Sequence, residues 1–205
     1  GFAGGLLHVL NHSIFKGLLF LDAGAVIQKT NTGEMDHLGG IAKSMPMTSI
    51  LFLIGALSIC GLPLFNGFIS EFMIYFGLFH GLLSLPLNGV VVCALGILAL
   101  ALMGALALAC FAKVYGTVFS GEPRDPSRAA EIHDPSAFMV VPMSILAGLC
   151  LWIGLAPETI AEFAFQAGSY LSYTSKNGLD WDKVMMPLSV IVALSLLFLA
   201  LVVAL

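Results

Sequence analysis

The sequence predicts an all-α protein, a polytopic transmembrane helix bundle with about five spans, one of which is a discontinuous helix. Hydrophobic residues make up 59% of the 205 residues, only 10% are charged, and the mean hydropathy is +1.01. A soluble domain would be about a quarter charged. Several apolar stretches also reach the ~20 residues that a spanning helix needs. These features exclude an ordinary soluble globular domain.

The first two spans differ in continuity. Residues 1–27 form one apolar segment, which is followed by a polar loop over 28–45. Residues 46–83 are longer than one span needs and short for two spans with a loop. The sequence GLPLFNG (61–67) interrupts this stretch, and proline cannot continue the helical hydrogen-bond ladder. We therefore expect one discontinuous helix, a device that recurs in transporters.

Three further spans are expected, over residues 88–119, 137–155 and 185–205. A polar loop (120–136) and a mixed connection (156–184), which we expect to lie partly in the membrane interface, separate them. With five crossings, the loops 28–45 and 120–136 fall on the same side. They contain Lys29, Lys43, Arg124 and Arg128, against Lys176 and Lys183 on the other side. The positive-inside rule therefore favours the first side as cytoplasmic.

The strongest candidates for chemistry lie in the first span. His8, His12 and Lys16 recur at four-residue spacing, so they share one stripe of a helix. A basic residue deep in a span costs at least ~2.5 kcal/mol and by default marks an ion or proton path. Histidine changes charge with small changes in its surroundings, which suits a proton relay. The alternative is a structural lysine with two packed, hydrogen-bonded histidines.

Other ionisable residues are weaker candidates. Glu71 follows the interruption by four residues, beside Asn66 and Ser70, where freed backbone groups and water would keep it titratable. Asp22 is either a partner for a charge on another face or an interfacial residue. Lys113 is near the end of its span, where snorkelling explains it equally well, and His80 is an outlet or a boundary residue. The predicted proton pathway therefore comprises His8, His12, Lys16, Glu71, Asp22 and Lys113.

No cofactor or metal site is predicted. Cys60, Cys93, Cys110 and Cys150 lie scattered in apolar segments without CxxC pairing, so we interpret them as small buried hydrophobes. Two histidines at this spacing could bind a metal, but no third ligand is near in sequence. The cysteine spacing of iron–sulfur clusters is missing too. We expect no redox chemistry and no catalytic residue in this chain, and no nucleic-acid partner.

Three stretches together resemble one family: LHVLNHSIFKGLLFLDAGAVIQKT, MDHLGGIAKSMP and ALSICGLPLFNGFISEFMIY. They are similar to the antiporter-like membrane subunits of respiratory complex I, of membrane-bound hydrogenases and of multisubunit cation/proton antiporters. The large membrane subunit of hydrogenase-4 and formate hydrogenlyase complexes is the nearest type. The resemblance covers residues 1–120, which would hold the second-repeat part of the proton-conducting domain. Residues 121–205 would be C-terminal transmembrane helices.

The resemblance implies a bundle of about fourteen helices built from two inverted repeats, each with a broken helix. Because the chain opens on Gly1 within an apolar stretch, we expect it to be a fragment without the first-repeat glutamate–lysine pair. By motif, His8, His12 and Lys16 match the central relay helix. Glu71 matches the charged residue after the second broken helix, where other family members carry lysine.

The implied function is proton translocation in a redox-driven complex of the hydrogenase or NADH:quinone oxidoreductase type. The implied partners are other membrane subunits, the lipid bilayer and protons, with sodium as the alternative ion. The implied location is the plasma (inner) membrane of a prokaryote. The alternatives are a sodium/proton antiporter subunit and a non-conducting scaffold whose buried charges only hold the bundle together. Nothing in the sequence specifies a quinone site.

Overall fold

The computed structural model describes residues 1–124, 132–171 and 181–204, and these form helices and loops without a β-strand. Five helical stretches in this part of the chain are long and apolar enough to cross a membrane: Phe2–Thr30, Asn66–Ser84, Leu87–Phe119, Ala137–Leu155 and Val184–Val202. The predicted all-α bundle with about five spans is confirmed.

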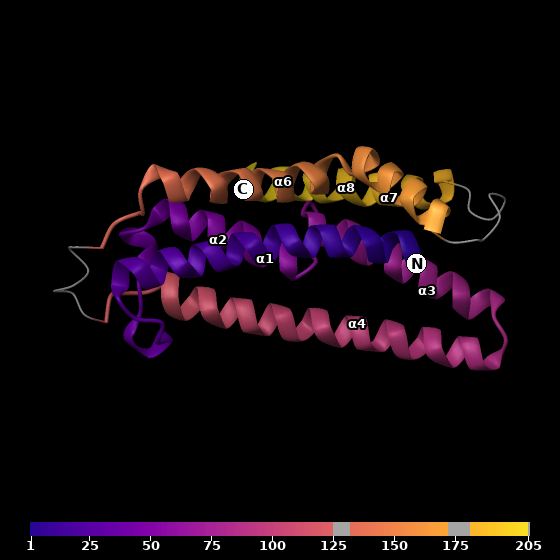
Figure 1. Ribbon diagram of the computed structural model, residues 1–205, viewed down its shortest axis with the longest axis horizontal. Helices are drawn as coiled ribbons and strands as arrows, with labels where there is room; N and C mark the ends of the chain where they lie inside the picture. Colours follow the sequence, from indigo (N-terminus) through magenta and orange to yellow (C-terminus); the bar gives the residue numbers. More distant parts are fainter. Residues whose placement is uncertain (125–131, 172–180, 205) are drawn as a thin grey trace.

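Helix α1 (Phe2–Thr30) runs through the middle of the molecule and packs against α2, α3, α6 and α7 (Figure 1). Its buried residues recur every three or four positions, which places them on one face. Asn31 ends the helix in the left-handed conformation, with φ 55°, and its N–H donates to the carbonyl of Ile27. One broad face of α1 is thus committed to the protein interior.

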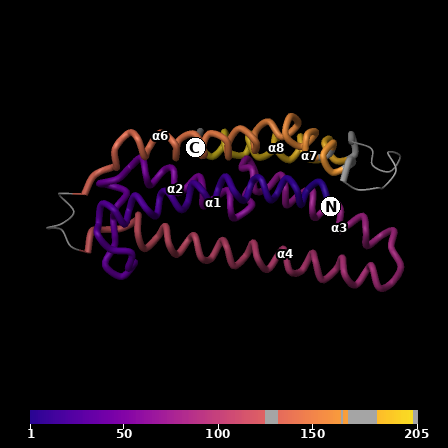
Figure 2. The backbone as a smooth tube through the Cα atoms, viewed as in Figure 1, coloured from indigo at the N-terminus to yellow at the C-terminus, as the bar shows by residue number. Residues whose placement is uncertain are grey.

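The predicted interruption of the second span is present. Helix α2 (Pro46–Ile59) begins with proline in its first turn, where the missing N–H costs nothing. Helix α3 (Asn66–Ser84) follows after residues 60–65 and continues along the bundle from the end of α2 (Figure 2). Within the break, Gly61 has φ 64° and Leu64 has φ 79°, which is a strained value for a residue other than glycine.

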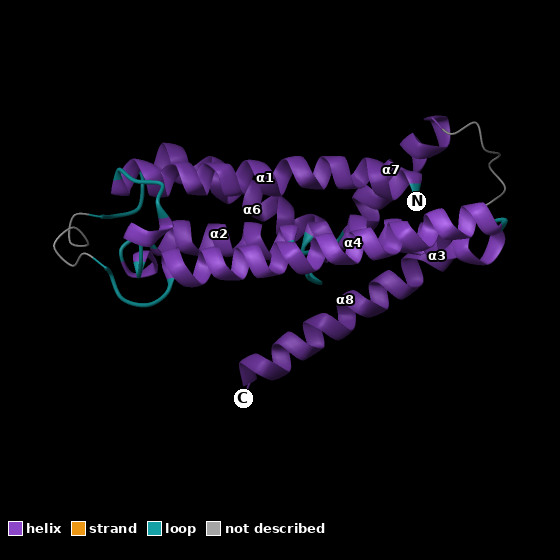
Figure 3. Ribbon diagram, turned by 90° about the horizontal axis from the view of Figure 1, so that it is seen from below, coloured by secondary structure: helices purple, strands orange, loops and turns teal. Residues whose placement is uncertain are grey.

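The remaining helices cover two sides of this centre. Helix α4 (Leu87–Val114) continues into a π-helical turn, η3 (Tyr115–Phe119), and only Cys93 of α4 is buried. Helix α6 (Ala137–Leu155) has the predicted bounds. Helix α7 (Pro157–Leu171) packs on α1 through Ala161 and Ala164, and α8 (Trp181–Ala204) runs at an angle to the other helices (Figure 3).

The loops 28–45 and 120–124 lie at the same end of the bundle, as expected. Two short 3-10 turns, η1 (Met35–His37) and η2 (Ile41–Lys43), carry the first loop. The two loops are joined by the Gly40 N–H to Ser120 carbonyl bond of 3.0 Å and by the Lys43–Glu122 ion pair at 2.7 Å. Of the charges used for orientation, Arg128, Lys176 and the side chain of Lys183 lie outside the described residues.

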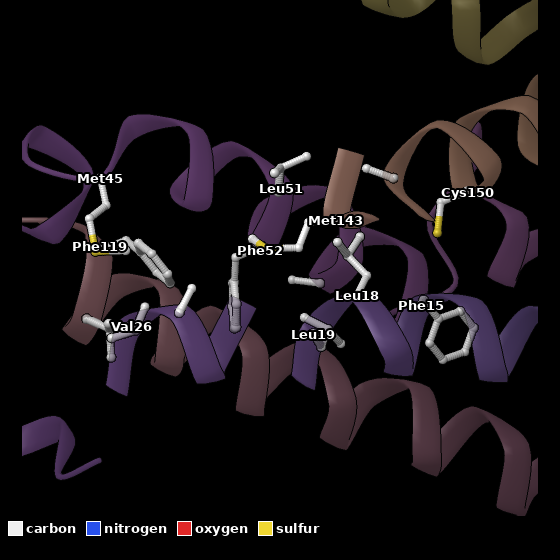
Figure 4. Packing of buried hydrophobic residues seen from close by; sticks show 14 of the residues in the cluster. Phe15, Leu18, Leu19, Val26, Met45, Leu51, Phe52, Phe119, Met143 and Cys150 are labelled. Carbon is white, nitrogen blue, oxygen red and sulfur yellow. The ribbon is translucent and has the colours of Figure 1, made fainter. Parts of the chain in front are cut away.

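Two apolar clusters hold the bundle together. The larger one joins α1, α2, η3 and α6, and Phe15, Leu18, Phe52, Phe119 and Met143 are at most 5% exposed in it (Figure 4). The smaller cluster joins the start of α1 to α3, α7 and α8. The larger core therefore contains residues from both expected parts of the chain, 1–120 and 121–205.

Candidate functional site

The stripe of basic residues lies on the flank of α1, next to its buried face. The ring centroids of His8 and His12 are 6.1 Å apart. His8 and Lys16 are half-buried and His12 is exposed. The Nζ atom of Lys16 lies 5.9 Å from the centre of the Phe20 ring, within range of a cation–π contact. Among the described side chains, the ion pairs are His37–Glu34 and Lys43–Glu122, and neither involves Lys16.

His8 connects this stripe to the break in the second span. Its Nδ1 atom lies 3.1 Å from the hydroxyl oxygen of Ser70, and the Ser70 hydroxyl donates to the Gly67 carbonyl at 3.0 Å. Since the single hydroxyl proton of Ser70 is used in that bond, Ser70 accepts from His8, and Nδ1 carries the hydrogen. The Nε2 atom of a neutral His8 is then the nitrogen left to receive a proton.

A pair of buried asparagines makes a second bridge at the same level. The Asn11 amide donates to the Asn66 carbonyl at 2.7 Å, and the Asn66 amide lies 3.4 Å from both the carbonyl and the side-chain oxygen of Asn11. Both side chains are fully buried, and Asn66 Oδ1 has no hydrogen-bond partner among the described residues. Asn66 and Ser70, which precede Glu71, thus both make hydrogen bonds to α1 at the start of α3.

Asn11 is a residue that the sequence reasoning missed. The signal was available, because Asn11 stands four residues after Leu7 and three before Ile14, on the apolar face of a helix. A polar side chain on that face needs a partner inside the protein.

Glu71 lies directly against the break. A Cβ atom added to Gly61 would collide with the Glu71 carboxylate, so Gly61 leaves the space that this carboxylate fills. Glu71 is half-buried, whereas Asn66 and Ser70 beside it are buried. The predicted proximity of the acid to the interruption is therefore confirmed.

Two glycine contacts fix the shape of the break. A Cβ atom at Gly67 would collide with the Ser58 carbonyl oxygen, so α3 starts in close contact with the end of α2. A Cβ atom at Gly154 would collide with the backbone of Leu64, so α6 presses on the break from outside. The contact at Gly154 joins residues 90 positions apart, and no local sequence signal indicates it.

The Asp22 side chain is fully buried in the protein, and neither carboxylate oxygen has a hydrogen-bond partner among the described residues. The expected ion pair with a charge on another face is not formed with any described side chain. Six residues of helix separate Asp22 from Lys16, which places them about 120° apart around α1.

The other candidates stand apart from this cluster. Lys113 is exposed in the last turn of α4, and His80 is exposed near the end of α3. Cys93 and Cys150 are buried and Cys60 is half-buried, but Cys110 is exposed, so the interpretation as a buried hydrophobe is wrong for Cys110. In the described part of the chain, no three His, Cys, Asp or Glu side chains form a group that could hold a metal ion.

A broken helix beside polar residues of a neighbouring helix recurs in membrane transport proteins. Residues 1–98 match the family model described as NADH:quinone oxidoreductase/Mrp antiporter, TM. This part of the chain is therefore similar to the antiporter-like membrane subunits of complex I, hydrogenase and Mrp type.

Particular relatives refine this class. The chain is 42% identical to hydrogenase-4 component B of Escherichia coli over 165 residues and 43% identical to formate hydrogenlyase subunit 3 of the same organism over 159 residues. These alignments cover 78% and 75% of the chain but 24% and 25% of the relatives. The chain thus spans about a quarter of the length of these relatives.

A solved structure has a similar fold. It is the membrane-bound sulfane sulfur reductase, an archaeal respiratory membrane complex, with a TM-score of 0.66 and 27% identity over 87% of this chain and 27% of the other. The predicted family resemblance, and its hydrogenase type, are confirmed.

Proposed function

We propose that this chain carries protons within the membrane part of a redox-driven complex of the hydrogenase or NADH:quinone oxidoreductase type. The similarity to these membrane subunits supports a role of this kind, and the route within the chain is our inference. The observation that carries the proposal is the hydrogen bond between His8 and Ser70, which joins the basic stripe of α1 to the break before α3. In this proposal protons move between His8, His12 and Lys16 on one side and Glu71 on the other.

The surroundings of these groups suit exchange rather than permanent pairing. Lys16 has an aromatic ring and no carboxylate as its described neighbour. The Glu71 carboxylate touches Gly61 in the break and is half-buried, so water and freed backbone groups can reach it. A charge arriving at one of these sites changes the proton affinity of the next, because charges interact strongly where water is scarce.

The exposed flank of α1, which carries His12 and Lys16, needs further protein to pack against it within a membrane. Polar and ionisable residues within membrane spans face a bundle interior or a water-filled cavity rather than lipid. Because His12 is exposed and Lys16 half-exposed, we propose that further helices of the assembly close this side of the path. The proposed partners are therefore other membrane subunits of a hydrogenase or complex I-like assembly.

The proposal extends to the location, the division of the chain and the accessory sites. The chain would lie in the plasma (inner) membrane of a prokaryote, with the loops 28–45 and 120–136 on the cytoplasmic side. Residues 1–120 would be the second-repeat part of the conducting domain and 121–205 the C-terminal helices. Asp22 and Lys113 would be accessory proton sites, and the redox chemistry would belong to partner subunits.

The test uses inverted membrane vesicles that contain the complete complex, with proton uptake driven by its redox reaction. We expect Lys16→Ala and Glu71→Gln each to lower proton uptake at least tenfold while the complex still assembles, because each removes one titratable group. Ser13→Ala is the matched control on α1, since among the described residues the Ser13 hydroxyl bonds only to the Leu10 carbonyl of its own helix. If both variants assemble and pump normally, the scaffold alternative is correct.

A sodium/proton antiporter subunit is the second candidate, favoured by the Mrp antiporters in the matching family. The same vesicles separate the two functions. Proton movement that needs sodium, and that a sodium gradient drives without redox turnover, would establish the antiporter.

A further inference from the structure

A polar cavity of about 680 Å³ opens at the loop end of the bundle. The end of α1, the 3-10 turns and the segment after η3 line it, with Lys29, Thr30, Ser44 and Arg124 among the lining residues. The Thr30 hydroxyl donates to the Val26 carbonyl, one turn further into α1. The cavity therefore reaches the end of the helix that carries Asp22.

A pair of hydroxyl groups lies deeper, between α2 and the π-helical turn. Ser49 is 3% exposed, and its Oγ atom lies 3.0 Å from the Tyr115 hydroxyl. The Tyr115 ring stacks on Phe119 with 5.3 Å between centroids. Hydroxyl groups both donate and accept, so each member of the pair has the capacity to bond to a further partner such as water.

The register of α1 against α2 places Asp22 within roughly one turn of the level of this pair. A Cβ atom at Gly55 would lie 3.0 Å from the Leu19 side chain, so these positions face each other. The two helices run in opposite directions (Figure 1), and Ser49 precedes Gly55 by six residues. Ser49 is then level with about residue 25 of α1, roughly one turn nearer the loop end than Asp22. Asp22 follows Leu19 by three residues and so lies on the same face.

Asp22 adds a buried titratable group to this arrangement. It is fully buried among apolar residues of the larger core, and both of its oxygens lack a described partner. A carboxylate in such surroundings is very costly unless it binds a proton or water reaches it.

Few ionisable groups face Asp22 from the helices packed on α1. Helix α2 carries none, and α6 carries only Cys150. Helix α3 brings Glu71, Tyr75 and His80, and the described side chains of α7 include Glu158 and Glu162, which are exposed. The π-helical turn brings Tyr115. On α1 itself, Lys16 lies about 120° round the helix, and Lys29 lies seven residues on, at the cavity.

We propose that Asp22 is a proton-binding site at the inner end of a hydrated inlet, which runs from the loop-end cavity past Ser49 and Tyr115 between α1 and α2. A proton arriving along water forms an O–H bond on the Asp22 carboxylate and leaves by the reverse step, with no other reactant. The use of this proton in translocation rests on the proposed function, whereas the inlet does not.

The inlet is tested by thiol accessibility. In the complete complex, with the four native cysteines replaced by alanine, Ser49→Cys is treated in membrane vesicles with a small charged thiol reagent. The matched control is Ala56→Cys, on the same face of α2 and two turns further from the cavity, where the side chain is 5% exposed. We expect Ser49→Cys to react at least tenfold faster than Ala56→Cys. Equal rates overturn the inlet, and Tyr115→Cys repeats the measurement if Ser49→Cys does not assemble.

The proton site is tested by Asp22→Asn, which keeps the shape and removes the titratable group. We expect at least a tenfold loss of proton uptake in the assembled complex, restoration by Asp22→Glu, and loss of a carboxylic-acid infrared band that shifts in heavy water. Full uptake in Asp22→Asn overturns the role of Asp22. Normal pumping by Lys16→Ala and Glu71→Gln would instead remove the proposed function, and the thiol rates would still decide the inlet.

Discussion

Helices α1 and α4 are almost equal in length, but they differ in how much of their surface is buried against other parts of the protein. Eleven of the 29 residues of α1 are buried in the protein, against one of the 28 residues of α4. Helix α4 needs few protein neighbours because lipid can cover its apolar side chains. Helix α1 carries Asn11 and Asp22 on its buried face, which only protein or enclosed water can accommodate. The contrast indicates that the chemistry of this chain is concentrated where helices pack most closely.

The largest loss of stability should come from disrupting the contact between Gly154 of α6 and the backbone of Leu64 in the break, which we call the clamp. In Gly154→Ala the new methyl group would collide with the backbone of Leu64 and Phe65, which cannot move without displacing the break. We expect a loss of about 3 kcal/mol in stability and little assembled protein. Thermal unfolding of the detergent-solubilised protein measures this.

Gly148→Ala is the control on the same helix, because nothing lies within 4 Å of its added Cβ atom. It should unfold at the temperature of the unmodified protein or slightly above. If both glycine variants behave alike, α6 does not press on the break as described.

The interruption between α2 and α3 could be predicted from the sequence, but the contact of α6 that fixes its shape could not. Pro63 and its flanking glycines indicate a break through backbone chemistry alone, and the periodic spacing of His8, His12 and Lys16 indicates their common stripe. The clamp at Gly154 and the burial of Asp22 depend on which helices become neighbours. That is decided by side-chain packing between distant segments, so a single sequence does not display it.

The next largest effect concerns the buried asparagine bridge. Asn11→Ala removes the partner of the Asn66 side chain and leaves buried polar groups without hydrogen bonds. We expect a loss of about 1–3 kcal/mol. Ser13→Ala, on the exposed side of the same helix, should stay within about 0.5 kcal/mol. Equal effects in chemical or thermal unfolding would mean that the bridge does not stabilise the contact between α1 and α3.

A smaller effect is expected at the loop end, where Asp134 caps α2 from 86 residues away. Its carboxylate accepts from the Thr48 N–H at 3.0 Å, from the Thr48 hydroxyl at 2.9 Å and from the Met47 N–H at 3.1 Å. Asp134→Ala should cost about 1–2 kcal/mol, as removal of a helix N-cap does. Asp134→Asn keeps the oxygen that bonds to Thr48 and should cost less. The order of the two unfolding temperatures checks this assignment.

The smallest effect on stability and on proton uptake is expected at Lys113 of α4. Lys113 and Lys16 are both lysines in apolar helices, but Lys113 is exposed in the last turn of α4, where its charge complements the helix dipole and its stem can extend to the membrane surface. Lys113→Gln should change stability by less than about 0.5 kcal/mol. It should also change proton uptake in vesicles less than twofold, whereas Lys16→Ala abolishes most of it. A loss at Lys113 as large as that at Lys16 would show that burial in the bundle does not separate essential proton sites from accessory ones in this protein.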